Sequence, residues 1–412
     1  MFICYYGKIV NKFNQGDVIK MIKLNIRKAI TFSLVTACFF SLTPMKTNAA
    51  WKKDNTGWWY TVNNSYAKGW KEIDGKWYYF YSTGYMAHDT VIGGYKLDSD
   101  GAWITSTSNN KTKVTESQAS EVTVGTAQEF VNAIGSNKKI ILKPGVYNLS
   151  DVKQINNSDS GVKFIPVDDG NELNVIGVHD LAIEGSEAGK VEIKVDPRFA
   201  NIINFSNVKN ITIKNIVAGH TPAKYECNAG VLKFTNSNNI SISNSHLYGC
   251  GSIGLDLHNV SKLEASNCLI DHCSLRAIQI YDSSDIKFIE NKIIDHEAYS
   301  NIVMIDGGKG IVFEKCEFAN NNNFMWNFIE TSNKSDTLFD SCVIKNNSKS
   351  SNSEFNDENI CLFKTTDYFG KCDSTITVKN SEIAKNTCDS LVDNKESVKF
   401  DNCTINNNTF SK

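Results

Sequence analysis

The sequence has few prolines, almost no charge imbalance and no run of basic residues. Five prolines in 412 residues are too few for a proline-rich disordered chain. Lysine and arginine total 43 against 45 aspartates and glutamates, which gives a formal net charge of −2. Because no basic tract is present to neutralise phosphates, nucleic acid is not an expected partner.

Complete enzyme motifs are also missing. The sequence contains no G-x-G-x-x-G or P-loop motif, no H-E-x-x-H motif, no G-x-S-x-G motif and no paired C-x-x-C motifs. These absences argue against nucleotide-binding, zinc-protease and serine-hydrolase chemistry of the common kinds. Function must therefore be inferred from repeats and from the columns of side chains that repeats create.

A short strand-like segment recurs along the C-terminal part of the chain. Most steps between copies are 22 to 29 residues and one is 38, and the copies begin at Ile211, Ile240, Leu263, Ile286, Ile311, Leu338, Ile376 and Val398. One alternating strand per repeat of this length is typical of a solenoid in which each coil stacks only on its neighbours. The pattern predicts an all-β solenoid.

The segment before these repeats has the pattern of a cap for the first coil of the solenoid. Residues 127–134 have helical spacing, and the strand-like segment 139–147 follows. A helix here would cover the open end of the first coil. The helix and the L-K-P-G-V-Y-N-L sequence resemble the capped entrance of pectate-lyase-like right-handed parallel β-helices. The resemblance covers residues 122–412 and implies a fold rather than one activity.

The N-terminal region has the features of an export signal. Residues 21–49 combine positive charges, an apolar stretch and a small-residue cleavage site. The apolar stretch is too short for a stable membrane span. We therefore expect a secreted protein, with residues 1–20 as a non-native extension if translation starts at Met21. A lipoprotein signal ending at Cys38 is the alternative.

Residues 50–103 form an aromatic module that holds six of the seven tryptophans. Aromatic strands such as 77–80, broken by Asp74 and Gly75, are typical of successive β-hairpins. A unit of this size has little interior, so some of its rings must face a ligand. Residues 104–121, which are polar and lack aromatic side chains, are expected to form a linker.

The sequence of residues 69–80, G-W-K-E-I-D-G-K-W-Y-Y-F, resembles the choline-binding repeat of Gram-positive surface proteins. The resemblance implies aromatic cages that bind quaternary ammonium groups of cell-wall teichoic acid by cation–π attraction. Carried over by position, the expected wall-facing rings are Trp59, Trp70, Trp77 and Tyr79. Stacking on sugars, or rings that only hold the hairpins together, are the alternatives.

Twelve cysteines in an exported protein raise the question of disulfides. Equivalent positions after the strand hold Cys268, Cys316, Cys342 and Cys403, which we expect to be packed thiols. Cys250 and Cys273 form a second column. Because neighbouring coils are about 4.8 Å apart, a strained disulfide framework is left open as the alternative.

An asparagine follows the strand in most repeats. The predicted column consists of Asn215, Asn244, Asn267, Asn291, Asn380 and Asn402. Asparagine tolerates turn conformations, and stacked amides bond to one another. The column therefore indicates a structural ladder at the turns.

One polar column is a candidate catalytic or metal site. Two consecutive repeats share an Ile-Asp-His sequence, which predicts that Asp271 and Asp295 lie about 5 Å apart, as do His272 and His296. Paired carboxylates share a proton or a hard cation such as calcium. Aspartate with a histidine pair suits a transition metal, and an acid–base pair is a third possibility.

The I-D-H-C sequence that contains Asp271 resembles the W-I-D-H-C coil of pectate lyases. The resemblance implies that Asp271 is a calcium ligand and that Arg276 is the base, and His258 lies nearby in sequence. Isoleucine replaces the tryptophan, and the family's later motif with paired arginines is not found. Solvated turn residues that happen to repeat are the alternative.

These features predict an exported, wall-attached protein whose β-helix binds or processes a polysaccharide. An enzyme of this kind would be a polysaccharide lyase or a glycoside hydrolase, and the only cofactor suggested is calcium. The alternatives are a non-catalytic surface adhesin and a metal-binding β-helix. Weaker candidates for a groove wall or a sugar contact lie in two excursions: His220, Lys224, Tyr225, Glu226, Phe324 and Trp326.

Overall fold

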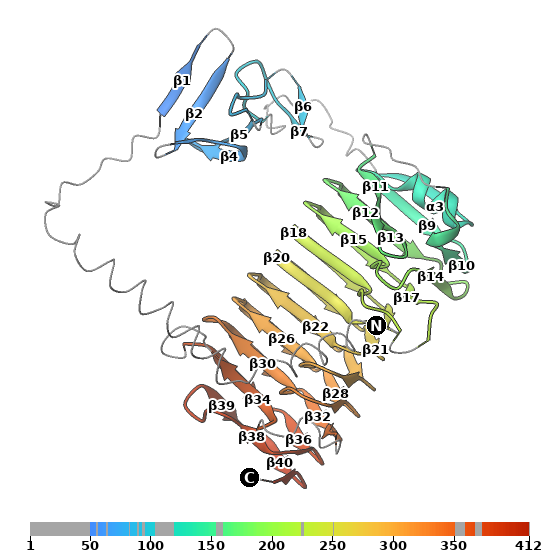
Figure 1. The fold of residues 1–412 in the computed structure, drawn as a ribbon, viewed down its shortest axis with the longest axis vertical. Helices are drawn as coiled ribbons and strands as arrows, with labels where there is room; N and C mark the ends of the chain where they lie inside the picture. The colour runs from blue at the N-terminus through green and yellow to red at the C-terminus, as the bar shows by residue number, and fades with distance from the viewer. Residues whose placement is uncertain are drawn as a thin grey trace, which may run out of the picture. The chain divides into compact units, whose positions relative to one another are not determined.

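The computed structural model describes an elongated stack of strands and a group of hairpins (Figure 1). The predicted export signal, residues 1–20 and most of the predicted linker lie outside the described residues. The described residues are 50–54, 57–62, 65–81, 83–88, 90–92, 95–103, 119–153, 160–223, 226–249, 251–350, 359–366 and 373–411. No helix within these ranges has the length and apolar character needed to cross a membrane.

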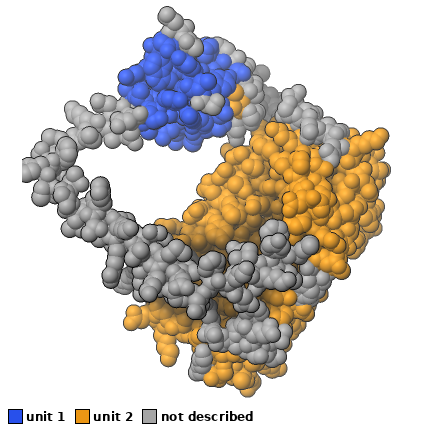
Figure 2. Space-filling view, in the orientation of Figure 1, with its two compact units in different colours: residues 1–90, 96–104 blue, residues 91–95, 105–412 orange. Residues whose placement is uncertain are grey.

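Two compact units divide the chain near residue 104, coloured separately in Figure 2. One comprises residues 1–90 and 96–104, and the other comprises residues 91–95 and 105–412. The division lies at the C-terminal end of the predicted aromatic module.

The aromatic module consists of short antiparallel hairpins, as predicted. Its strands are β1 (Ala50–Lys53), β2 (Trp58–Val62), β3 (Ser65–Tyr66), β4 (Gly69–Ile73), β5 (Lys76–Phe80), β6 (Val91–Ile92) and β7 (Tyr95–Lys96). The β4–β5 turn places Asp74 and Gly75 at φ 52° and 75°, the positive values that match the strand twist. A small core contains Ala67, Ile73, Phe80 and Met86.

The entrance of the β-helix domain contains β8 (Ser120–Val124), α3 (Ala127–Ala133), β9 (Lys138–Leu142), β10 (Gly145–Asn148) and η1 (Leu149–Asp151). The hydroxyl of Thr126 accepts the Glu129 N–H at 3.2 Å and caps α3, whose Phe130 is buried. The predicted helix is confirmed. The predicted linker end at residue 121 is wrong, because β8 begins at Ser120 and pairs with β9.

Two rows of stacked strands form one 19-stranded sheet, because β18 (Leu232–Ser243) and β20 (Ile253–Ser266) each run through both rows. Row 1 consists of β12 (Gly170–Ile176), β15 (Ile203–Ser206), the first halves of β18 and β20, β22 (Arg276–Tyr281), β26 (Val303–Asp306), β30 (Ile329–Ser332), β34 (Cys361–Thr366) and β38 (Ser390–Val392). Strand β11 (Val162–Val167) pairs antiparallel with β12. Row 2 consists of β9, β13 (His179–Gly185), β16 (Lys209–Lys214), the second halves of β18 and β20, β23 (Ser284–Ile289), β27 (Lys309–Glu314), β31 (Asp336–Asp340), β35 (Thr375–Lys379) and β39 (Val398–Asp401).

Two further rows complete the coils, and all their pairings are parallel. Row 3 is a ten-stranded sheet of β10, β14 (Val191–Val195), β17 (Val217–His220), β19 (His246–Tyr248), β21 (Leu269–Asp271), β24 (Lys292–Ile294), β28 (Glu317–Ala319), β32 (Val343–Lys345), β36 (Glu382–Ala384) and β40 (Thr404–Asn406). Row 4 consists of β25 (Glu297–Ala298), β29 (Asn322–Asn323), β33 (Ser348–Lys349), β37 (Thr387–Cys388) and β41 (Thr409–Phe410). The predicted right-handed parallel β-helix is confirmed.

The core is a set of stacked apolar columns. Alternate side chains of each strand point inward, and equivalent phenylalanines stack coil upon coil. Ring centroids are 4.7 Å apart for Phe205 and Phe234 and 4.8 Å for Phe313 and Phe339. Burying a side chain of this kind stabilises the fold by roughly 1.5–3 kcal/mol. Packing of the inward side chains therefore fixes how the strands of neighbouring coils align. The outward side chains do not contribute to this core and can contact a ligand.

The turn ladder differs from the prediction at one position. Asn215, Asn244 and Asn267 have φ of 57°, 48° and 52° in the left-handed region, but Glu290 holds this position in the next coil at 56°. Asn291 is buried instead and accepts the N–H of Cys268 at 2.7 Å. The prediction for Asn291 is wrong by one residue, because Ile289 pairs with Ser266 and sets the register.

The predicted column of packed thiols consists of free cysteines. Cys268, Cys316 and Cys342 are nearly inaccessible, whereas Cys403 is partly exposed. Their sulfurs lie close to carbonyl oxygens of their own turns, for example 3.3 Å from Cys268 to Ser266. Cys250, the partner considered for Cys273, lies outside the described residues.

Candidate functional site

The register of row 3 separates the predicted aspartate pair. Asp271 lies opposite Ile294 in the paired strands β21 and β24. Asp295 shares its position with His272, since both occupy the left-handed turn after the strand at φ 56° and 55°. The predicted pairings of Asp271 with Asp295 and of His272 with His296 are therefore wrong. Inward isoleucines set this register, and a slip of one residue moves every side chain to the other face.

His296 lies in the core and not at a surface. Its Nδ1 accepts the N–H of Cys273 at 3.0 Å, and its Nε2 lies 3.0 Å from the carbonyl oxygen of Ile270. Burial lowers the pKa of His296 to about 4, so the ring is neutral at pH 7. The same column continues with Asn321, Asn347, Asn386 and Asn408, each accepting the backbone N–H of the coil before it. His296 therefore holds coils together, where no ligand reaches it.

Asp271 is the centre of a polar cluster on the outer face of row 3. His246 Nε2 and His272 Nδ1 lie 3.0 and 3.1 Å from its Oδ1. Burial alone would raise the pKa of Asp271, but the hydrogen bonds from the two imidazoles outweigh it and hold the pKa below its usual value. Tyr248, opposite Asp271, donates to Glu192 at 3.1 Å. The cluster offers one carboxylate flanked by imidazoles.

This donor set does not match a calcium site. Calcium takes six to eight oxygen ligands, whereas Asp271 has histidines beside it and Asp295 is out of register. Within the described ranges, no three His, Cys, Asp or Glu side chains are arranged to hold a metal ion.

The outer face of row 1 carries a second cluster, which motif searching overlooked. Lys233, Asp256 and Gln279 lie side by side on β18, β20 and β22. His258 and Tyr281 lie side by side in the next outward position of β20 and β22. Because adjacent strands are about 4.8 Å apart, these five side chains converge over three coils.

Asp256 is the hub of this cluster. Its Oδ1 lies 2.8 Å from His258 Nε2 and 2.9 Å from Gln279 Nε2, and its Oδ2 lies 3.2 Å from Lys233 Nζ. Burial would raise the pKa of Asp256, but the hydrogen bond from His258 and the charge of Lys233 outweigh it, and the pKa is lowered. The side chain of Asp256 is 7% exposed and that of His258 33%. A buried carboxylate thus holds an accessible imidazole.

An aspartate behind a histidine gives the imidazole a defined orientation. Such a pair suits general acid–base catalysis, and the same side chains bond readily to sugar hydroxyls. The His258 and Tyr281 ring centroids are 5.0 Å apart, so an aromatic surface adjoins the imidazole. The arrangement therefore combines an acid–base group, a cation at Lys233 and an apolar platform.

Arg276 belongs to row 1 and not to the Asp271 cluster. It begins β22, where its guanidinium donates to Gln279 and, at 2.8 Å, to Ser300. Gln279 in turn donates to Asp256. Arg276 therefore positions the Asp256 cluster through Gln279.

Polar contacts extend along row 1 in both directions. Toward the entrance, Glu172 accepts from Asn201 at 2.6 Å and from Asn204 at 2.8 Å. Toward the C-terminus, Glu330 accepts from Asn301 at 2.9 Å. In the sequence, each of these residues is a polar residue next to an inward apolar one, in or beside the first strand of its repeat. Any half-buried strand has this pattern, so it did not single out a site. Only stacking reveals that these polar residues share one row, which Met304 interrupts between Gln279 and Glu330.

The aromatic module brings some of its predicted rings together. Trp70 and Tyr79, opposite one another on β4 and β5, have centroids 5.4 Å apart, and Trp77 is 40% exposed. Trp59 contacts Tyr85 at 6.0 Å. The rings meet edge to face, which leaves ring faces for a cation or a sugar.

The weaker candidates divide into buried and exposed ones. His220 is buried, with Nε2 2.9 Å from the carbonyl oxygen of Ala200. Phe324 stacks on Tyr299 at 4.9 Å, and Trp326 is 43% exposed. Two candidates lie outside the described residues: Lys224 and Tyr225.

Family comparisons match both parts of the chain. The model described as "Right handed beta helix region" matches residues 140–304 and 229–366, which together span more than half of the chain. The model described as "Choline-binding repeat" matches residues 67–105. No curated protein matches the sequence.

Three solved structures are similar to parts of this chain. Choline binding protein F from Streptococcus pneumoniae is 34% identical over 14% of this chain and 20% of its own, with a TM-score of 0.13. This chain thus spans a fifth of that structure. An alginate lyase from Paenibacillus sp. str. FPU-7 is 10% identical over 70% of this chain and 97% of its own, with a TM-score of 0.44. Pectate lyase Pel9A is 11% identical over 68% and 71%, with a TM-score of 0.37.

Proposed function

The chain belongs to the right-handed β-helix family and also carries a choline-binding repeat, and on this basis we propose that it is an exported, wall-attached protein that binds or processes a polysaccharide along row 1. The observation that carries the proposal is the Asp256–His258 pair, in which a buried anion holds an accessible imidazole. A polar row perpendicular to the strands suits a linear polymer, because successive coils offer equivalent positions to successive sugars.

Each residue of the cluster has a role in this proposal. His258 transfers a proton to or from the glycan, and Asp256 fixes its orientation. Lys233 pairs with Asp256 and holds its carboxylate in place, and Tyr281 packs against a sugar ring. Arg276 is a positioning residue that acts through Gln279.

The aromatic module supplies attachment in this proposal. Trp59, Trp70, Trp77 and Tyr79 present rings to choline groups of teichoic acid. The match to the choline-binding repeat, over residues 67–105, supports this role for the last three. If excess choline releases the protein from purified walls, the ammonium site is supported. If tight binding to walls persists in excess choline, the rings stack on sugars and do not form an ammonium site.

A second location for the chemistry is the Asp271 cluster of row 3, where His246, which was not predicted, lies 3.0 Å from Asp271. His272 also contacts Asp271 there, at 3.1 Å. Here too a carboxylate lies beside imidazoles, an arrangement that suits general acid–base catalysis. Matched substitutions at the two aspartates distinguish the two locations.

The test incubates the full chain with uronic-acid polysaccharides, neutral polysaccharides and purified walls, with and without calcium. Product absorbance reports elimination, and new reducing ends without absorbance report hydrolysis. Asp256→Asn is expected to abolish turnover, whereas Asp271→Asn and the exposed control Asp401→Asn retain it. Loss with Asp271→Asn alone moves the site to row 3. Glycan binding without turnover across the panel supports a non-catalytic carbohydrate-binding protein.

A further inference from the structure

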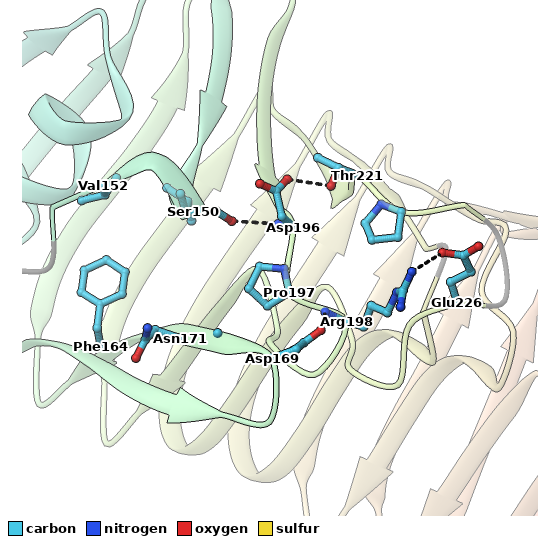
Figure 3. A pocket seen from close by; sticks show the side chains of 13 residues that line it. Ser150, Val152, Phe164, Asp169, Asn171, Asp196, Pro197, Arg198, Thr221 and Glu226 are labelled. Carbon is cyan, nitrogen blue, oxygen red and sulfur yellow. Dashed lines mark hydrogen bonds and ion pairs between the residues drawn. The ribbon is translucent and has the colours of Figure 1, made fainter. Parts of the chain in front are cut away.

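A depression of about 570 Å³ lies beside the entrance end of row 1 (Figure 3). Its walls are the β11–β12 hairpin and the turns that follow β14 and β17, which lead into β15 and β18 of row 1. Asn171 on its rim precedes Glu172, the first polar residue of the row 1 network. The depression is therefore continuous with the proposed glycan path, three strand spacings, or roughly 14 Å, from β20.

The depression has an apolar floor and a polar rim. Val152, Phe164 and Pro197 supply apolar surface, as their positions in Figure 3 show. Asn171 and Thr221 supply an amide and a hydroxyl at the edge. This combination is typical of a site for one sugar or a few, since the ring C–H groups need apolar contact and the hydroxyls need polar partners.

The charges of the rim select the kind of sugar. Three carboxylates, those of Asp169, Asp196 and Glu226, line the depression together with one guanidinium, that of Arg198. Arg198 is bonded to Glu226 at 2.8 Å. Asp196 accepts the Thr221 hydroxyl at 2.7 Å. The rim therefore carries an excess of negative charge and repels an anionic ligand.

Lys233 of row 1, near this end, is already paired with Asp256 at 3.2 Å. A polyuronate that entered the depression would therefore meet an excess of carboxylates.

We infer that this depression is a subsite for a neutral or amino sugar of the glycan, so that the substrate is a non-anionic wall polysaccharide and not a polyuronate. The inference rests on the proposed function. It also selects the chemistry, because elimination needs the acidic C–H beside a uronate carboxyl group. A substrate of the inferred class lacks this carboxyl group, so the protein would hydrolyse the glycan or bind it without cleaving it.

The test measures binding of three tetrasaccharides to the full chain by calorimetry, with excess choline present to saturate the aromatic module. The probes are a β-1,4-linked N-acetylglucosamine tetramer, its de-N-acetylated form and a galacturonic acid tetramer. We expect binding of one or both glucosamine probes and at least tenfold weaker binding of the galacturonate. The double variant Asp196→Asn/Glu226→Gln should bind the galacturonate about tenfold more tightly than the native protein does, because it removes carboxylates that repel the anion, while Asp401→Asn leaves that binding unchanged.

Three outcomes would overturn the inference: equal or tighter binding of galacturonate, unchanged galacturonate binding in the double variant, or no binding of any probe. These outcomes are separable from failure of the proposed function. If Asp256→Asn abolishes turnover of a panel polysaccharide while the double variant does not alter tetramer binding, the function stands and the subsite does not. Thermal unfolding of the double variant, compared with Asp401→Asn, verifies that the fold is retained.

Discussion

His296 makes the fold sensitive to acid. Its pKa is about 4 in the folded protein, against an ordinary value of 6.5. Between these values the unfolded chain binds a proton that the folded chain does not, so stability falls as the pH decreases from 6.5 to 4. The difference corresponds to about 3 kcal/mol of folding free energy, of which roughly 2.5 kcal/mol is lost at pH 4.5.

The perturbation is His296→Asn, which introduces the residue that the ladder uses at Asn321 and Asn347 in the following coils. Asparagine accepts the Cys273 N–H in place of Nδ1 but carries no group that titrates. Urea unfolding followed by circular dichroism at pH 7.5 and pH 4.5 measures the effect. The native protein should lose about 2.5 kcal/mol more than the variant between the two pH values.

His88→Asn is the matched control, because His88 is exposed and belongs to the aromatic module, outside the β-helix. This control should keep the pH dependence of the native protein. If His296→Asn also keeps the full native loss between pH 7.5 and 4.5, His296 is not the buried neutral group described above.

Three further predictions concern the ladder, the aromatic module and the thiols. Asn347→Leu removes four hydrogen bonds to neighbouring coils and should cost at least roughly 3 kcal/mol in urea unfolding, whereas Asn346→Gly at the adjacent exposed turn costs little. Trp70→Ala separates the Trp70–Tyr79 pair and should abolish retention on a choline resin; retention equal to that of the native protein would contradict the assignment. Burial raises the pKa of Cys268 to about 11, so an alkylating reagent at pH 8 should label it only after unfolding. Rapid labelling of folded Cys268 would contradict its inward position.

The coil architecture was predictable from the spacing of apolar residues. Ile211, Ile240 and Leu263 are consecutive inward positions on β16, β18 and β20, as their spacing indicated. The helix at 127–133 followed from its apolar spacing after Thr126. These features depend on local alternation and capping, which a single sequence contains.

Register was predicted less well. The shared Ile-Asp-His sequence aligned Asp271 with Asp295, whereas the structure places Asp271 opposite Ile294. A strand of three residues has two isoleucines that could each point inward in the second copy, and packing chose Ile293. Identity between short segments does not fix a register that differs by one residue, because the side chains alternate with a period of two.

The sequence by itself determined the repeated coil, its capped entrance and the hairpins of the aromatic module, because these depend on residues close together in the chain. Only the tertiary structure decided which polar side chains meet. Lys233, Asp256 and Gln279 are each 23 residues apart and look like isolated outward positions in separate strands. Stacking the coils places them side by side and buries the carboxylate of Asp256 behind His258. The depression by Arg198 likewise arises from turns of different coils, which no single repeat contains.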